Sequence, residues 1–148
     1  MRCVLDTNVV LSGLLWNGPT RQLLAAAQQG VIELLTSEEL IAELRDVLRR
    51  PKCAKQLLKV GGSADRVLDL YSSAASLVDP VAVPRLAPDP DDDVVIGTAL
   101  AAKADFIVTG DHALLSVLRY EGGRIVTVRE ALRAIGPSAP SEGSSSNK

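Results

Sequence analysis

The sequence predicts an α/β protein of three layers, α/β/α, in which helices cover both faces of a central parallel sheet. Short apolar runs alternate along the chain with longer segments whose apolar residues recur at helical spacing. Strands that alternate with helices form parallel, doubly wound sheets. The chain has 148 residues, which is enough for one domain with a substantial core.

The first half of the chain is predicted to contain two strands and two helices. Residues 2–5 are mainly apolar and precede three turn-forming residues, which indicates a buried strand. Gly, Asn and Pro mark 13–19 as a loop, and the helix at 21–29 stops at a glycine. Residues 31–35 are again apolar and form the second strand, while 38–50 form a helix with a core-facing stripe.

The second half is predicted to continue the alternation up to residue 135. The predicted helices are 52–60, 64–76, 94–103, 112–118 and 129–135, and the predicted strands are 76–79, 106–108 and 124–128. Residues 80–90 contain four prolines and are expected to form an ordered surface loop. Residues 137–148 are rich in Ser and Pro, so we expect a domain at 1–136 followed by a disordered tail.

Composition narrows the class of protein. Hydrophobic residues make up 47% of the chain and aromatic residues only 3%, so the core must be aliphatic. The apolar stretches are shorter than the ~18 residues of a membrane span, and the N-terminus lacks the pattern of a secretion signal. Cys3 and Cys53 form no metal-binding or redox motif. We therefore expect a soluble, cytoplasmic protein with no membrane partner.

Acidic residues occur where this fold places its ligands. Asp6 and Asp111 each follow a predicted strand, and the carboxyl ends of parallel strands share one edge of the sheet. Asp92 and Asp93 begin a predicted helix, and Glu43 lies at the edge of an inward-facing stripe. Carboxylates brought together would repel one another unless a cation joined them. Oxygen ligands without a His or Cys cluster favour Mg²⁺ or Mn²⁺, whose matching chemistry is phosphodiester hydrolysis.

Each of these acids also has a purely structural explanation. Asp6 can cap a turn or a helix, and Glu43 can extend to solvent or form an ion pair. Acids at a helix start stabilise the helix dipole. Capping accounts for one or two acids, whereas four of the five residues 89–93 are acidic.

The acidic motifs together resemble a known family. They are Leu5-Asp6-Thr7-Asn8-Val9, the segment 37–44 around Glu43, the helix start at 89–93 and the run 104–111 that ends in Asp111. In this order they are similar to a PIN-domain nuclease over residues 1–135. The branch they most resemble contains the toxin components of toxin–antitoxin systems, related to VapC.

The resemblance implies roles for individual residues. Asp6 would be the central metal ligand, Glu43 the second acid and Asp111 the acid after the late strand. The remaining ligand is ambiguous between Asp92 and Asp93, with Asp92 narrowly favoured. The residues expected to orient these carboxylates or water are Thr7, Asn8 and Thr109.

The resemblance implies a Mg²⁺- or Mn²⁺-dependent endoribonuclease, acting as a toxin that a cognate antitoxin protein holds inactive. The alternatives are an RNA-processing PIN nuclease without an antitoxin, and a non-catalytic PIN scaffold that serves as a binding module. A homodimer is also implied.

The distribution of charge suggests where RNA would bind. The net charge is −2, but residues 45–66 hold seven basic and two acidic residues, a local charge of +5. Local positive potential is what phosphate binding needs. We predict an RNA-facing surface that includes Arg45, Arg49, Lys52 and Lys59; the alternative is a solvated helix face.

Overall fold

A six-stranded sheet forms the centre of the protein. The computed structural model describes residues 1–83 and 90–136. The strands are β1 (Arg2–Leu5), β2 (Glu33–Thr36), β3 (Ala75–Leu77), β4 (Phe106–Val108), β5 (Arg119–Tyr120) and β6 (Gly123–Val126). Their order is β3-β2-β1-β4-β6-β5, and all neighbours are parallel except β5 and β6.

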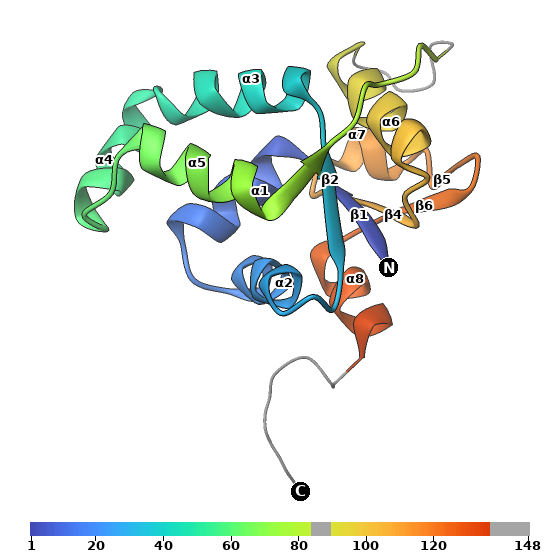
Figure 1. The fold of residues 1–148 in the computed structure, drawn as a ribbon, viewed down its shortest axis with the longest axis horizontal. Helices are drawn as coiled ribbons and strands as arrows, with labels where there is room; N and C mark the ends of the chain where they lie inside the picture. Colours follow the sequence, from blue (N-terminus) through green and yellow to red (C-terminus); the bar gives the residue numbers. More distant parts are fainter. Residues whose placement is uncertain (84–89, 137–148) are drawn as a thin grey trace, which may run out of the picture.

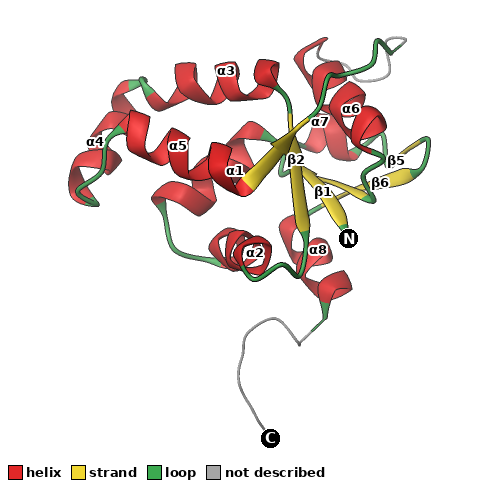
Figure 2. Ribbon diagram, viewed as in Figure 1, coloured by secondary structure: helices red, strands yellow, loops and turns green. Residues whose placement is uncertain are grey.

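Helices cover both faces of this sheet (Figure 1). They are α1 (Thr7–Leu15), α2 (Pro19–Gln28), α3 (Glu38–Leu48), α4 (Pro51–Lys59), α5 (Ala64–Ala74), α6 (Pro90–Ala102), α7 (His112–Leu115) and α8 (Val128–Ile135). Figure 2 shows the strands enclosed between helices such as α2 and α8 on one side and α6 on the other. The predicted three-layer α/β/α class is confirmed.

Alternation along the strands divides the core into two layers. Cys3 and Leu5 pack with α1, α2, α3 and α8, whereas Val4 between them packs with α6 and α7. Successive strand residues face opposite sides of a sheet, so one short apolar strand serves both layers. Val4 pairs with Leu35 on β2 and with Ile107 on β4, and these three fully buried side chains form the centre of one layer.

The structure corrects the prediction for residues 13–19, because α1 extends to Leu15 and includes Gly13. The helix is buried on several sides, so its sequence has no amphipathic stripe to reveal it. Its last four carbonyl groups would need partners. The backbone N–H of Trp16 donates to Ser12, Arg21 donates to Gly13 and Leu14, and the Gln56 amide donates to Leu15. Residues outside the helix therefore supply the hydrogen bonds at its C-terminal end.

Other differences concern short elements. Strand β3 starts at Ala75, which the sequence had assigned to the preceding helix. Helix α7 is only four residues long, whereas a helix was predicted over 112–118, and the two-residue strand β5 follows at Arg119–Tyr120, where no element was predicted. Pairing with a neighbouring strand decides these elements, and two or three residues carry too little periodicity to predict it.

Parts of two predictions lie outside the described residues, namely the loop at 84–89 and the tail at 137–148. Among the helices that are described, none is long and apolar enough to cross a membrane.

Gly97 allows residues 80–83 to lie directly on α6. The backbone N–H of Val81 donates to the Gly97 carbonyl at 3.1 Å, and a Cβ added at Gly97 would stand 2.4 Å from the Val81 carbonyl oxygen. The clashing atom belongs to the backbone, so it cannot rotate away. The chain before α6 is thus held at a separation that only glycine permits.

We expect Gly97→Ala to lower the free energy of unfolding by about 1–3 kcal/mol, the usual cost of overpacking. Gly62→Ala is the matched control, because its added Cβ would meet no atom closer than 3.7 Å. Thermal unfolding followed by circular dichroism measures both. Equal melting temperatures for the two variants would contradict the close contact.

Candidate active site

Asp6 joins the end of β1 to the start of α1. Its backbone N–H donates to the Val108 carbonyl of β4 at 3.0 Å, which fixes it at the carboxyl edge of the sheet. Its Oδ1 accepts from the Thr7 backbone N–H at 2.8 Å, and its Oδ2 accepts from the Thr109 hydroxyl at 2.7 Å. Asp6 therefore caps α1, as the structural alternative predicted, and also belongs to a buried polar network.

The carboxyl group of Asp6 is difficult to ionise in this position. It is only 9% exposed. Burial raises its pKa above the ordinary value, and the negative charge of Asp111 adds to this effect, whereas the hydrogen bonds from Thr109 and Thr7 oppose it. The protein thus holds a carboxylate where a nearby cation would stabilise its ionised form.

Thr7 connects Asp6 to Glu43. While its backbone donates to Asp6, its hydroxyl donates to Oε1 of Glu43, 36 residues further along the chain. Glu43 is half-buried and lies in the middle of α3, which begins at the buried N-cap Ser37. The first and second predicted acids consequently meet on either side of one threonine.

Thr109 makes the corresponding connection to Asp111. Its buried hydroxyl donates to Asp6 and accepts from the Asp111 backbone N–H at 3.1 Å. Asp111 itself is exposed, and its Oδ1 accepts from the Ala113 backbone N–H at 2.9 Å. A continuous chain of hydrogen bonds therefore runs from Glu43 through Asp6 to Asp111.

The acids at the start of α6 differ in burial. Asp92 is 7% exposed, whereas Asp93 is half-buried. The helix that carries them is fixed against the start of α3, since the Thr98 hydroxyl lies 3.0 Å from the hydroxyl of Ser37. Asp89 lies outside the described residues.

The oxygen atoms left over at this site fit a hard divalent cation. Each carboxylate oxygen has about two acceptor positions, and one on each Asp6 oxygen is already occupied. Among the residues that the structure describes, no hydrogen bond occupies these second positions, Oε2 of Glu43 or Oδ2 of Asp111. Across the described ranges, however, no group of three or more Asp, Glu, His or Cys side chains stands ready to hold a metal ion. The donor type fits Mg²⁺ or Mn²⁺, but the structure does not gather a closed cage.

The predicted RNA-binding cations lie on another part of the surface. Arg45, Arg49, Lys52 and Lys59 are all exposed. They follow α3 away from the junction of β2 and α3 and continue onto α4 at the far end of that helix (Figure 1). We call these four residues the basic strip; Arg45 and Arg49 follow Glu43 by two and six residues, so they lie on the other side of α3 from Glu43.

A pocket that the sequence did not reveal lies beside Asp111. Its volume is about 670 Å³, and we call it the α8 pocket. It is lined by Asn8, Val9, Ser12, Pro19, Thr20, Thr109, Gly110, Asp111, Thr127, Val128 and Arg129. Thr127 follows β6 just as Asp6 follows β1, so the rule about strand ends could have pointed to it.

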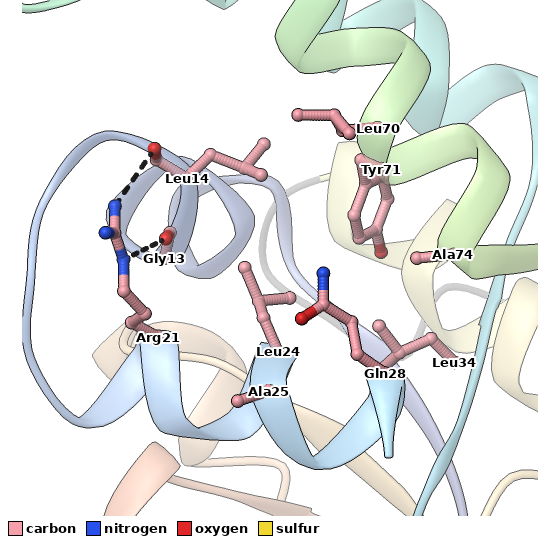
Figure 3. Close-up of a pocket in the computed structure, with 10 residues that line it drawn as sticks. All are labelled: Gly13, Leu14, Arg21, Leu24, Ala25, Gln28, Leu34, Leu70, Tyr71 and Ala74. Atoms are coloured by element: carbon pink, nitrogen blue, oxygen red, sulfur yellow. Dashed lines mark hydrogen bonds between the residues drawn. The ribbon is translucent and has the colours of Figure 1, made fainter. Parts of the chain in front are cut away.

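A second cavity, of about 410 Å³, lies between α1, α2, β2 and α5 (Figure 3). Its walls are mainly apolar, with Leu24 and Leu34 facing the ring of Tyr71. Arg21 lies at its edge, where it binds the carbonyls of Gly13 and Leu14. None of the predicted site residues lines it, so the acids and this cavity are separate features.

The fold and the site define an α/β protein that places linked carboxylates at the carboxyl edge of a parallel sheet. Residues 2–113 match the PIN domain family, and the chain belongs to that family. It is also similar to the uncharacterized protein MJ1680 of Methanocaldococcus jannaschii, with 31% identity over 121 residues that cover 79% of this chain and 75% of that protein. PIN domains are generally metal-dependent nucleases, so membership of the family indicates a nuclease.

The raised pKa of Asp6 predicts how Asp6→Asn changes the pH dependence of stability in metal-free protein. The folded protein holds the Asp6 proton more tightly than the unfolded chain does, so this contribution to stability is complete below pH 3.8 and is lost as pH rises through the folded-state pKa. Asparagine does not titrate. The melting temperature of Asp6→Asn minus that of the unsubstituted protein should therefore increase between pH 3.5 and 7.5.

Melting in EDTA measures this difference, and Asp69→Asn on the exposed surface of α5 controls for the loss of one carboxylate. A difference for Asp6→Asn that stays constant or falls toward neutral pH would contradict a raised pKa.

Proposed function

We propose that this protein is a Mg²⁺- or Mn²⁺-dependent endoribonuclease. The observation that carries the proposal is the hydrogen-bonded chain from Glu43 through Asp6 to Asp111, with Asp6 buried at the carboxyl edge of the sheet. Membership of the PIN family supports nuclease chemistry. The oxygen donors, together with the absence of a His or Cys cluster in the sequence, support a hard cation.

Asp6, Glu43, Asp92 and Asp111 would hold the cation. Such an ion supplies a more acidic water and neutralises charge on the attacked phosphate. Thr7 and Thr109 fix the carboxylates through hydrogen bonds, which keeps one face of each acid available. No side-chain nucleophile is required, because water attacks the phosphodiester.

RNA is the substrate that the basic strip supports. The exposed cations Arg45 and Arg49 lie on α3 and at its C-cap, on the other side from Glu43, and Lys52 and Lys59 lie on the next helix, so a strand that leaves the acids would pass over α3 to reach them. Their charges would bind phosphates without regard to sequence.

The biological role that we propose is the toxin of a toxin–antitoxin pair, on the resemblance of the acidic motifs to VapC-related proteins. Expression should then arrest growth, and co-expression of a small neighbouring gene should relieve the arrest. Cleavage without toxicity would favour an RNA-processing nuclease. Folded protein that binds RNA but never cleaves it would favour a non-catalytic scaffold. The homodimer that the resemblance implies is part of the proposal, and light scattering tests it.

The difference in burial between Asp92 and Asp93 predicts which of them is the ligand. We expect Asp92→Asn to lower cleavage of a fluorescent single-stranded RNA in Mn²⁺ by at least about 100-fold, because loss of a ligand displaces the ion. Asp93→Asn, with a half-buried side chain, should retain most of the activity. A larger loss for Asp93→Asn would reverse the assignment, and RNA left intact by the unsubstituted protein would reject the nuclease proposal.

The basic strip predicts the dependence of RNA binding on salt. Replacing Arg49 and Lys52 by Ala should reduce the slope of log affinity against log salt by about 1 to 2, as expected for two lost phosphate contacts. The control pair is Lys103→Ala with Arg119→Ala, because both cations are exposed and lie at the opposite, amino edge of the sheet. Fluorescence anisotropy in EDTA measures the slopes. Identical slopes for the two pairs would mean that the strip is only a solvated face.

A further inference from the structure

The α8 pocket shares two residues with the acidic network. Thr109 and Asp111 form part of its wall, and the hydroxyl of Thr109 lies 2.7 Å from Oδ2 of Asp6. A molecule in the pocket would therefore lie against Asp111, and only Thr109 would separate it from Asp6. The pocket can therefore accommodate the part of an RNA strand that lies next to the attacked phosphate.

The size and lining of the pocket suit one nucleotide. A volume of about 670 Å³ lies within the range of about 300–1,000 Å³ that is usual for small-ligand sites. Val9, Pro19 and Val128 provide an apolar surface for a ring or sugar face. The remaining wall is polar, with hydroxyl, amide and guanidinium groups.

Several polar groups of this wall are available to a ligand. Within the described residues, the side chains of Asn8, Ser12 and Arg129 make no hydrogen bond. The hydroxyl of Thr127 accepts from the Glu130 backbone N–H, and this keeps its own proton free to donate. The reciprocal bond from the Thr127 backbone to Glu130 fixes the start of α8 and so positions Arg129.

Arg129 is the one cation among the described residues that line the pocket. An arginine fork matches two oxygens of a phosphate, which makes it the preferred residue for phosphate recognition. The amide of Asn8 carries both donors and an acceptor, the groups that can bind the edge of an unpaired base. The pocket thus contains a group that can bind phosphate, a group that can bind a base, and the carboxylate of Asp111 in one wall.

We propose that the α8 pocket binds the nucleotide next to the bond that is cut, with Arg129 on its phosphate and Asn8 on its base. The inference rests on the proposed ribonuclease function and adds a subsite to it. Arg129 is a substrate-positioning residue, since it holds the strand while the acids and water act on the neighbouring phosphate.

The first test separates binding from chemistry. Arg129→Gln should raise KM for single-stranded RNA by about 10- to 100-fold with kcat nearly unchanged, the range for a lost hydrogen bond to a charged group. Arg129→Lys should recover part of the loss because it keeps the charge. Arg133→Gln is the matched control, because Arg133 is an exposed cation on the same helix outside the pocket. Equal KM values for Arg129→Gln and Arg133→Gln would overturn the inference.

The second test does not depend on cleavage. Nucleoside 5′-monophosphates titrated into metal-free protein should shift the amide resonances of Asn8, Gly110 and Val128, and Arg129→Gln should abolish the shifts. Inorganic phosphate should bind more weakly, and equal binding would reduce the site to a phosphate site and reject the nucleotide assignment.

Together the two tests distinguish the inference from the proposed function. If the protein binds nucleotides through Arg129 but cleaves no RNA, the nucleotide site is supported and the nuclease proposal is rejected. If the protein cleaves RNA with no contribution from Arg129, the nuclease proposal is supported and the nucleotide site is rejected. If the protein neither binds nucleotides nor cleaves RNA, both the nucleotide site and the nuclease proposal are rejected.

Discussion

The hydrogen bonds that hold the buried carboxyl of Asp6 constrain the rest of the site. One comes from the backbone of the next residue and the other from Thr109, 103 residues away in sequence. A buried carboxylate without donors would be expelled or protonated, so β1 and β4 must lie side by side for the site to exist. Their parallel pairing, which aligns Leu5 with Val108, brings Asp6 and Thr109 to the same edge. The pairing that builds the sheet therefore also builds the site.

Two threonines extend this constraint to the neighbouring segments. Thr7 donates its backbone N–H to Asp6 and its hydroxyl to Glu43, whereas the hydroxyl of Thr109 donates to Asp6 and accepts from the Asp111 backbone N–H, and so they bring Glu43 and the Asp111 loop to Asp6. Their side chains are short and their χ1 rotation is restricted, so little conformational freedom is lost in holding them. The result is a set of acids whose positions are defined by protein contacts while some of their oxygen atoms remain available.

The two surfaces that we propose for RNA binding differ in character. The basic strip on α3 and α4 consists of exposed cations, whereas the α8 pocket combines a single cation, Arg129, with a concave wall of apolar and polar groups. Exposed cations bind the phosphate backbone of any sequence. A concave site with hydrogen-bonding groups can discriminate between nucleotides. In the proposed ribonuclease, selectivity for particular nucleotides would thus depend more on the pocket than on the strip.

The sequence alone determined the three-layer class, the strands at β1 and β4, and the acids that follow them, because apolar runs and the polar residues that end them are local patterns. It did not reveal α1, since a helix buried on several sides has no stripe, nor β5, which exists through its partner, and it placed at 76–79 the strand that forms β3 at Ala75–Leu77. Only the tertiary structure decided that Asp6 is both a helix cap and the centre of a network, that Thr7 meets Glu43, and that Arg129 lies beside Asp111. These contacts join segments far apart in sequence, and side-chain spacing along the chain carries no information about which strand ends become neighbours.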